Sequence, residues 1–236
     1  MQTRYRLEGN ASDVYRYRMI RLWCEFVGLY VLLPVALVAV RLVNGAFPVL
    51  PVLWVAACPA AFYLARRHGW GRREWFGLGL SRTQVAGMAA RLSLAAALLA
   101  GGILLLEPGY FLELPRRNLG LWAVIMMAYP VLSVYPQGVL YRGFFFARYA
   151  VLFPGEQAKI LAGAVVFCLA HLVFMNVWAL ALTLVGGVLF NRTYRRTGSM
   201  LASDAEHAVC GQLVFTCGWG RFLYHGTARI VDAIGT

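Results

Sequence analysis

The amino-acid sequence predicts an all-α polytopic membrane protein, built as a bundle of about seven (six to eight) transmembrane helices. Of the 236 residues, 61% are hydrophobic and only 14% are charged, and the mean hydropathy is +0.64. A soluble domain would carry about 25% charged residues. Weakly charged apolar runs that are long enough to cross a bilayer recur along the whole chain. We therefore expect a single transmembrane domain over residues 1–236.

The predicted spans follow one another with short polar connections. They are expected at about 22–40, 47–65, 84–106, 119–135, 157–175, 177–193 and 200–217. Residues 1–19 form a polar segment before the first span, and the Trp- and Arg-containing stretch 68–82 is typical of a short helix or loop in the membrane interface. Pro130 and Pro136 are expected to kink the fourth run or to divide it into two helices.

The formal charge of +12 comes from 22 Lys+Arg against 10 Asp+Glu. The arginines gather near 16–21, 66–82 and 192–196, between apolar runs, as the positive-inside rule expects. This pattern favours a cytoplasmic N-terminus and contact with anionic membrane lipid, rather than the basic surface of a nucleic-acid-binding protein. No apolar core with a cleavage site follows the first residues directly, so we expect no cleaved signal peptide and a location in the bacterial inner (cytoplasmic) membrane.

Several ionisable residues fall inside the apolar runs, where charge is costly and side chains usually face the bundle interior. Taken singly, each can be a packing residue. Taken together, they predict a buried polar centre made by three separate spans. The candidates are Gln137, Tyr141 and Arg142, then His171 with Asn176, and then Asp204, Glu206 and His207. Two imidazoles in one dry pocket can bind a metal, or can hold a water and stabilise an oxyanion. A divalent metal such as zinc, bound by His171 and His207, is therefore one candidate cofactor.

Three short segments, YPQGVLYRG, FCLAH and EHAVCG, carry these residues in order. They resemble the three motifs of the CAAX-protease and bacteriocin-processing (CPBP) family of intramembrane endopeptidases, over roughly residues 119–217. The family pattern is a Glu-Glu pair with an arginine four residues after it, then Phe-x-x-x-His, then His-x-x-x-Asn or Asp. Phe167 and His171 complete the middle motif, and Arg142 and His207 match the other two. The resemblance implies a multi-helix membrane protein that acts on a peptide or membrane-protein substrate.

The sequence departs from this family at the positions that carry the chemistry. The glutamate pair falls on Gln137 and Gly138, and the amide or acid of the third motif falls on Gly211, with Gln212 adjacent. In the family, a glutamate activates the water that attacks the peptide. Loss of a positioned general base typically costs about 10²–10⁴-fold in rate. The family mechanism is therefore not expected to run unchanged in this chain.

Three interpretations follow from these departures. The first is a degenerate protease that binds a peptide or partner helices without cutting them. The second is an active endopeptidase that uses Glu206 or Asp204 together with His171 and His207. The third is a non-catalytic assembly subunit of a larger membrane complex. In each case Arg142 needs a counter-charge, and we expect Asp204, Glu206, or backbone carbonyls and water to provide it.

Overall fold

The computed structural model describes residues 2–44 and 48–223, with side chains from residue 12 onward, and every regular element in these ranges is helical. Six helical runs are long and apolar enough to cross a membrane. They are Ser12–Asn44, Val49–Arg67, Arg82–Leu106, Leu119–Arg148, Gly155–Phe174 and Val177–Thr197. A seventh long helix, α12 (Met200–Cys217), lies among them and carries the acidic residues of the last predicted span. The prediction of an all-α polytopic membrane protein is confirmed.

Most helices begin and end close to the predicted bounds, but the first run begins at Gln2 instead of about 22, and the fourth ends at Arg148 instead of about 135. The N-terminal half contains α1 (Gln2–Val27), α2 (Leu33–Asn44), α3 (Val49–Arg67), α4 (Arg72–Phe76) and α5 (Arg82–Leu106). The next elements are α6 (Glu113–Arg117), α7 (Leu119–Tyr129), α8 (Tyr135–Gly138), α9 (Phe145–Arg148), α10 (Gly155–Ala170), α11 (Val177–Thr197), α12 and α13 (Gly220–Leu223). Residues 1 and 47, the expected starts of the polar segment and of the second span, lie outside the described residues. The polar segment is otherwise part of α1.

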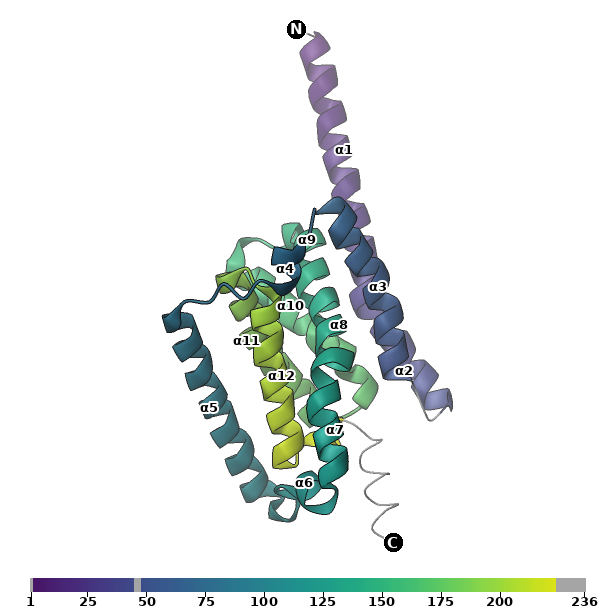
Figure 1. Ribbon diagram of the computed structural model, residues 1–236. Coiled ribbons are helices and arrows are strands. Elements are labelled where there is room, and N and C mark those ends of the chain that lie inside the picture. Colours follow the sequence, from purple (N-terminus) through teal and green to yellow (C-terminus); the bar gives the residue numbers. More distant parts are fainter. Residues whose placement is uncertain (1, 45–47, 224–236) are drawn as a thin grey trace.

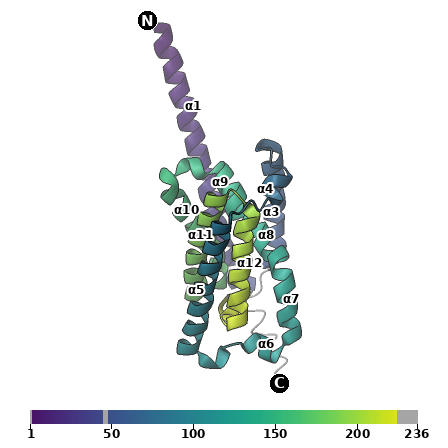
Figure 2. The same cartoon turned by 60° about the vertical axis from the view of Figure 1, so that its left-hand side comes forward.

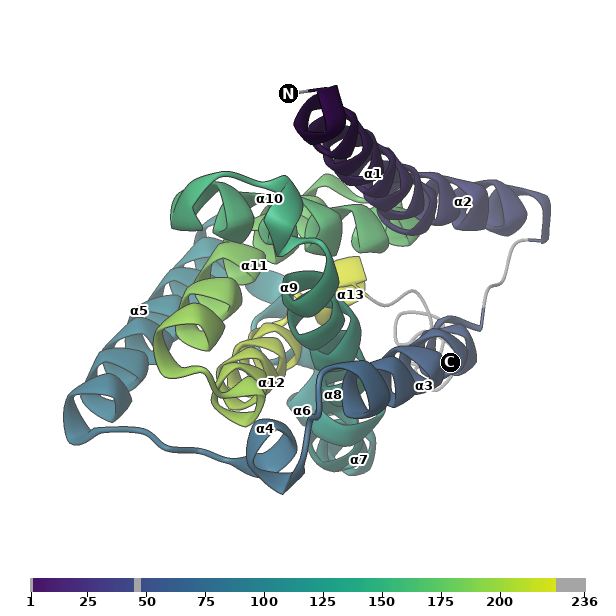
Figure 3. The same ribbon diagram turned by 90° about the horizontal axis from the view of Figure 1, so that it is seen from above.

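Helix α12 occupies the middle of the bundle. It packs against α5, α7 and α11, and also against the proline-containing run that includes α8. Figures 1 and 3 show α5 on one side of α12 and α3 on the other, while Figure 2 shows α12 between α5 and α7. Helix α1 extends well beyond the bundle at its N-terminal end (Figure 1). Side chains on different faces of α12 can therefore meet partners from several other spans.

The proline-containing run from Leu119 to Arg148 stays helical throughout, so of the two expected outcomes, a kink or a division into two helices, the division does not occur. Instead, its turns widen into π-helix at Pro130–Val134 and Val139–Phe144. A proline has no N–H, so Pro136 leaves the carbonyl of Leu132 without its usual helical donor. The indole Nε1–H of Trp54 on α3 donates to this carbonyl at 3.0 Å. The hydroxyl of Tyr30 likewise donates to the carbonyl of Leu140 in the second π-helical segment, at 2.8 Å. Neighbouring helices thus donate to backbone carbonyls of the wide turns, and the carbonyl of Leu140 also accepts from the N–H of Phe145.

The predicted interface stretch contains the short helix α4. Trp70 precedes it and packs edge-to-face against Trp75, with their ring centroids 4.9 Å apart. Helix α5 then begins with a capping box, in which Ser81 and Gln84 each accept a hydrogen bond from the backbone N–H of the other. This reciprocal cap is the sequence signal that starts the third span at residue 82.

Candidate functional site

Arg142 lies at the centre of the predicted polar group and is almost completely buried, with 1% of its surface exposed. It belongs to the second π-helical segment and points toward α12. Its Nε and Nη2 atoms donate to Oδ1 of Asp204 at 3.0 and 2.8 Å. The rings of Phe167 and Phe190 flank the guanidinium at 5.9 and 5.8 Å. The expected ion pair between Arg142 and an acid of the last span is confirmed, and that acid is Asp204.

The carboxylate of Asp204 occupies the space that a side chain at position 138 would need. A Cβ atom added to Gly138 would lie 2.3 Å from each carboxylate oxygen of Asp204. Position 138 is the second position of the first motif, where the family has a glutamate. The absent carboxylate is therefore replaced in space by one from another helix, and Arg142 keeps a counter-charge.

His207 lies on α12 within reach of the same guanidinium, and both of its ring nitrogens have partners. Nη2 of Arg142 donates to Nδ1 of His207 at 3.2 Å, and Nε2 lies 3.2 Å from the hydroxyl of Tyr129. Arginine has no acceptor atom, so Nδ1 must carry the lone pair and Nε2 the proton. His207 Nε2–H therefore donates to Tyr129.

Tyr129 comes from the last turn of α7 and fills the space beside Gly211. A Cβ atom at residue 211 would lie 2.3 Å from the Tyr129 hydroxyl oxygen. Position 211 is where the third family motif has an amide or acid. The adjacent Gln212 does not replace it, because its amide donates to the carbonyl of Met126 at 2.8 Å. The polar group nearest to His207 in this direction is thus a phenol from another helix.

Glu206, the second candidate acid, is directed to other partners. Its Oε1 accepts from Nε of Arg91 on α5 at 2.8 Å, and its Oε2 accepts from the hydroxyl of Thr193 on α11. Arg91 also donates to Thr193 at 3.1 Å. Only 1% of Glu206 is exposed. This acid therefore ties three helices together and does not pair with Arg142.

His171 and Gln137 complete the group of motif residues. Nδ1 of His171 donates to the carbonyl of Phe167 at 2.7 Å, which puts the lone pair of the neutral ring on Nε2. The amide nitrogen of Gln137 donates to the hydroxyl of Ser133 at 2.8 Å, while its Oε1 is buried without a partner among the described residues. Asn176, by contrast, caps α11 by accepting from the N–H groups of Trp178 and Ala179.

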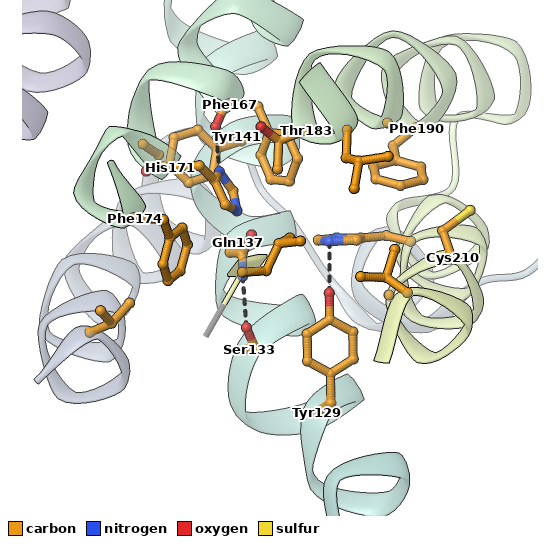
Figure 4. Close-up of a pocket in the computed structure, with 18 of the residues that line it drawn as sticks. Tyr129, Ser133, Gln137, Tyr141, Phe167, His171, Phe174, Thr183, Phe190 and Cys210 are labelled. Carbon is orange, nitrogen blue, oxygen red and sulfur yellow. Dashed lines mark hydrogen bonds between the residues drawn. The ribbon is translucent and has the colours of Figure 1, made fainter. Parts of the chain in front are cut away.

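A large cavity of about 810 Å³ opens beside these side chains. Tyr129, Gln137, His171 and His207 lie in its wall, which is otherwise mostly apolar, and Figure 4 shows the first three pointing into it. Among the described residues that line the cavity, Arg91 is the only charged one, and no carboxylate is present. The cavity can therefore offer hydrogen bonds and imidazole to a ligand, but no acidic general base.

The residues of this centre do not fit the zinc ion that two histidines suggested. Both nitrogens of His207 are engaged with protein groups, and His171 has only Nε2 left. In the described ranges, no group of three or more His, Cys, Asp or Glu side chains could hold a metal ion. A zinc centre needs three or four protein ligands. No catalytic step is therefore derived through a metal.

Tyr129, Ser133 and Arg91 were not predicted from the sequence as residues of this site. The first two had a detectable signal, because residues 129, 133 and 137 recur every four positions and so share one helix face. Arg91 stood alone inside an otherwise apolar span, which is itself a reason to expect a buried partner.

The fold is that of an integral membrane protein, with six candidate membrane-spanning helices among the described residues. More particularly, residues 117–212 match the family model described as type II CAAX prenyl endopeptidase Rce1-like. The resemblance drawn from the three motifs is confirmed over this segment, which is less than half of the chain. No curated protein and no solved structure matches the chain.

Proposed function

We propose that this protein is a degenerate CAAX-protease-like membrane protein that binds an apolar peptide segment or a partner helix without cutting it. The observation that carries the proposal is the cavity wall: it keeps the motif histidines but has no carboxylate among the described lining residues. The glutamine that replaces the first motif glutamate cannot take a proton from water. Both acids of α12 are held by arginines, and neither lines the cavity.

The chemistry of the cavity supports a peptide as its occupant. The wall is mainly aliphatic and aromatic, which suits the side chains of a membrane segment. The polar groups gather around Gln137, His171 and Tyr129, which suits a short stretch of backbone whose amide groups are not paired within a helix. A ligand with only hydrocarbon would leave these groups without partners.

Binding and cleavage are separated by one experiment on the full chain in lipid nanodiscs. Fluorescently labelled apolar peptides are incubated with the protein, binding is followed by anisotropy against protein-free nanodiscs, and cleavage by mass spectrometry. We expect binding without cleavage. Ala128→Trp, which fills the cavity, should abolish binding, while Ala123→Trp on the same helix α7 does not line the cavity and is the matched control.

The alternative of an active endopeptidase predicts a different result. Wild-type protein would then cleave a peptide, and His171→Ala or His207→Ala would remove that activity. Cleavage that survives both substitutions would come from a contaminant. Gln137→Glu restores a carboxylate at the first motif position and is expected to gain cleavage if the ancestral geometry is kept.

We also propose that the protein lies in a bacterial inner membrane, with its N-terminus in the cytoplasm and with anionic lipid at its arginine clusters. The alternation of arginine-rich and acidic connections supports this topology. The topology is tested by introducing single cysteines at Arg72 and Glu107 and labelling them with a membrane-impermeant reagent. The two positions should be labelled from opposite sides of the membrane. Assembly into a larger complex predicts co-purifying membrane subunits in mild detergent, and a lone monomer would count against it.

A further inference from the structure

The hydroxyl of Tyr129 is a hydrogen-bond donor in the cavity wall that no motif provides. Its oxygen lies 3.2 Å from Nε2 of His207, whose Nδ1 in turn lies 3.2 Å from Nη2 of Arg142. Because Nδ1 accepts from the arginine, Nε2–H donates to the Tyr129 oxygen, and the tyrosine's own proton is left to donate elsewhere. Tyr129 lines the cavity, so this proton is available to a ligand there.

The direction of this chain of hydrogen bonds is fixed at its buried end. Arg142 is 1% exposed and is also bound to Asp204, and the ring of Phe190 stacks on His207 with centroids 4.6 Å apart. Neither the guanidinium nor the imidazole has room to turn. A chain that starts at a cation polarises each later donor, so the Tyr129 hydroxyl is a stronger donor than an isolated phenol.

Two hydrogen-bond acceptors lie elsewhere in the same cavity wall. Oε1 of Gln137 is buried without a partner among the described residues, and Nε2 of His171 keeps its lone pair. Gln137 is only 8% exposed. These two acceptors share the cavity wall with the polarised donor of Tyr129, and Arg91 adds a charged donor to the lining. A short peptide backbone carries both complementary kinds of group, carbonyl oxygens and N–H groups.

We propose that Tyr129 is the residue that binds the carbonyl of a bound peptide, in place of the side chain missing at residue 211, and that Gln137 and His171 accept from the neighbouring N–H. Arg142 and His207 are positioning residues that orient the Tyr129 hydroxyl. Gly211 is required for this arrangement, because any Cβ at that position would lie 2.3 Å from the hydroxyl oxygen. This inference rests on the peptide-binding function proposed above and names the groups that recognise the ligand.

The test uses two fluorescent probes on the full chain in nanodiscs. One is a dansylated, amide-capped Leu-Leu-Gly-Leu-Leu peptide, and the other is dodecylpyrene, which has no hydrogen-bonding group. Tyr129→Phe should weaken binding of the peptide by about fivefold to tenfold, the loss expected for one hydrogen bond, and leave the hydrocarbon probe unchanged. Gly211→Ala should weaken peptide binding as well, because it displaces the tyrosine. The exchange Tyr129→Ala/Gly211→Asn returns a donor to position 211 and should restore most of the lost affinity.

Results that differ from these would refute either the role of Tyr129 or the binding function itself. If wild-type protein binds the peptide and Tyr129→Phe binds it equally well, the role of Tyr129 is wrong while the binding function stands. If Tyr129→Phe weakens both probes alike, the tyrosine acts by packing and the proposal fails. If wild-type protein does not bind the peptide, the proposed function fails. In that case ¹⁵N imidazole shifts still test the hydrogen-bond chain, which requires the Nε2–H tautomer of His207, and the Nδ1–H tautomer would refute it.

Discussion

Two arginine–carboxylate pairs meet on helix α12, and they differ in how far each arginine is buried. In the pair between Arg142 and Asp204, the side chains are 1% and 6% exposed and the closest atoms are 2.8 Å apart. In the pair between Arg91 and Glu206, the closest atoms are 2.7 Å apart, but the arginine side chain is 34% exposed while the glutamate is 1% exposed. The two distances are nearly equal, but the surroundings of the pairs differ. Arg142 and Asp204 form a closed pair, in which both side chains are buried. Arg91 and Glu206 form an open pair, because the arginine lines the cavity.

The difference follows from the geometry of one helix. Positions 204 and 206 are two residues apart, which turns the side chains by about 200° around the axis. Asp204 therefore joins α12 to the π-helical segment, while Glu206 joins it to α5 and, through Thr193, to α11. Both acids hold neighbouring helices in place. The two acids therefore have a structural role, although neither lines the cavity.

Breaking the closed pair is expected to have the largest effect. Asp204→Ala leaves the buried guanidinium of Arg142 without its counter-charge, and the free energy of unfolding should fall by about 3–5 kcal/mol. Denaturant unfolding of the purified protein in detergent measures this loss. The double variant Arg142→Met/Asp204→Leu removes both charges and should be more stable than Asp204→Ala alone. Wild-type stability of the single variant would show that the pair is not essential to the fold.

Breaking the open pair should cost less, and the cost should depend on which partner is removed. Glu206→Gln leaves an acceptor for Arg91, whose guanidinium also reaches the cavity, so we expect a loss of about 1.5–3 kcal/mol. Arg91→Leu leaves a carboxylate that is 1% exposed, so it should destabilise the protein more than Glu206→Gln does. The same unfolding measurement gives both values. Equal losses would mean that the cost does not depend on which partner of this pair is left without its counter-charge.

The closed pair also depends on the empty side-chain position at Gly138. Gly138→Ala places a Cβ atom 2.3 Å from both carboxylate oxygens of Asp204, and crowding of this kind costs about 1–3 kcal/mol. The loss should shrink in the Asp204→Ala background, and a double-mutant cycle measures that coupling. Gly101→Ala is the matched control, because a Cβ there meets nothing within 4 Å. Independent, additive losses would separate Gly138 from the ion pair.

The sequence predicted the parts of this site that charge balance requires. An arginine in an apolar span needs a counter-charge, and the nearby motif lacked one, so Asp204 or Glu206 could be expected to pair with Arg142. The choice between the two acids was not predictable, because it depends on which face of α12 meets which helix. The replacement of the missing side chain at 211 by Tyr129 was also not predictable, because the two residues are brought together only by packing of α7 against α12. Similarly, the widening of the fourth run into π-helix was not predictable from its prolines, and neither was the hydrogen bond from Trp54, on another span, to the carbonyl of Leu132.

Glu156 forms two ion pairs of similar length at an exposed position, and breaking them is expected to change stability least. Glu156 accepts from Nζ of Lys159 at 2.9 Å and from Nε of Arg195 at 2.7 Å, and its side chain is 53% exposed. Ion pairs at such positions are screened by solvent and salt, and the flexible side chains lose entropy when they pair. Glu156→Gln should therefore leave the unfolding transition unchanged within error at moderate salt. A loss as large as that of Asp204→Ala would mean that distance, and not burial, decides what these ion pairs contribute.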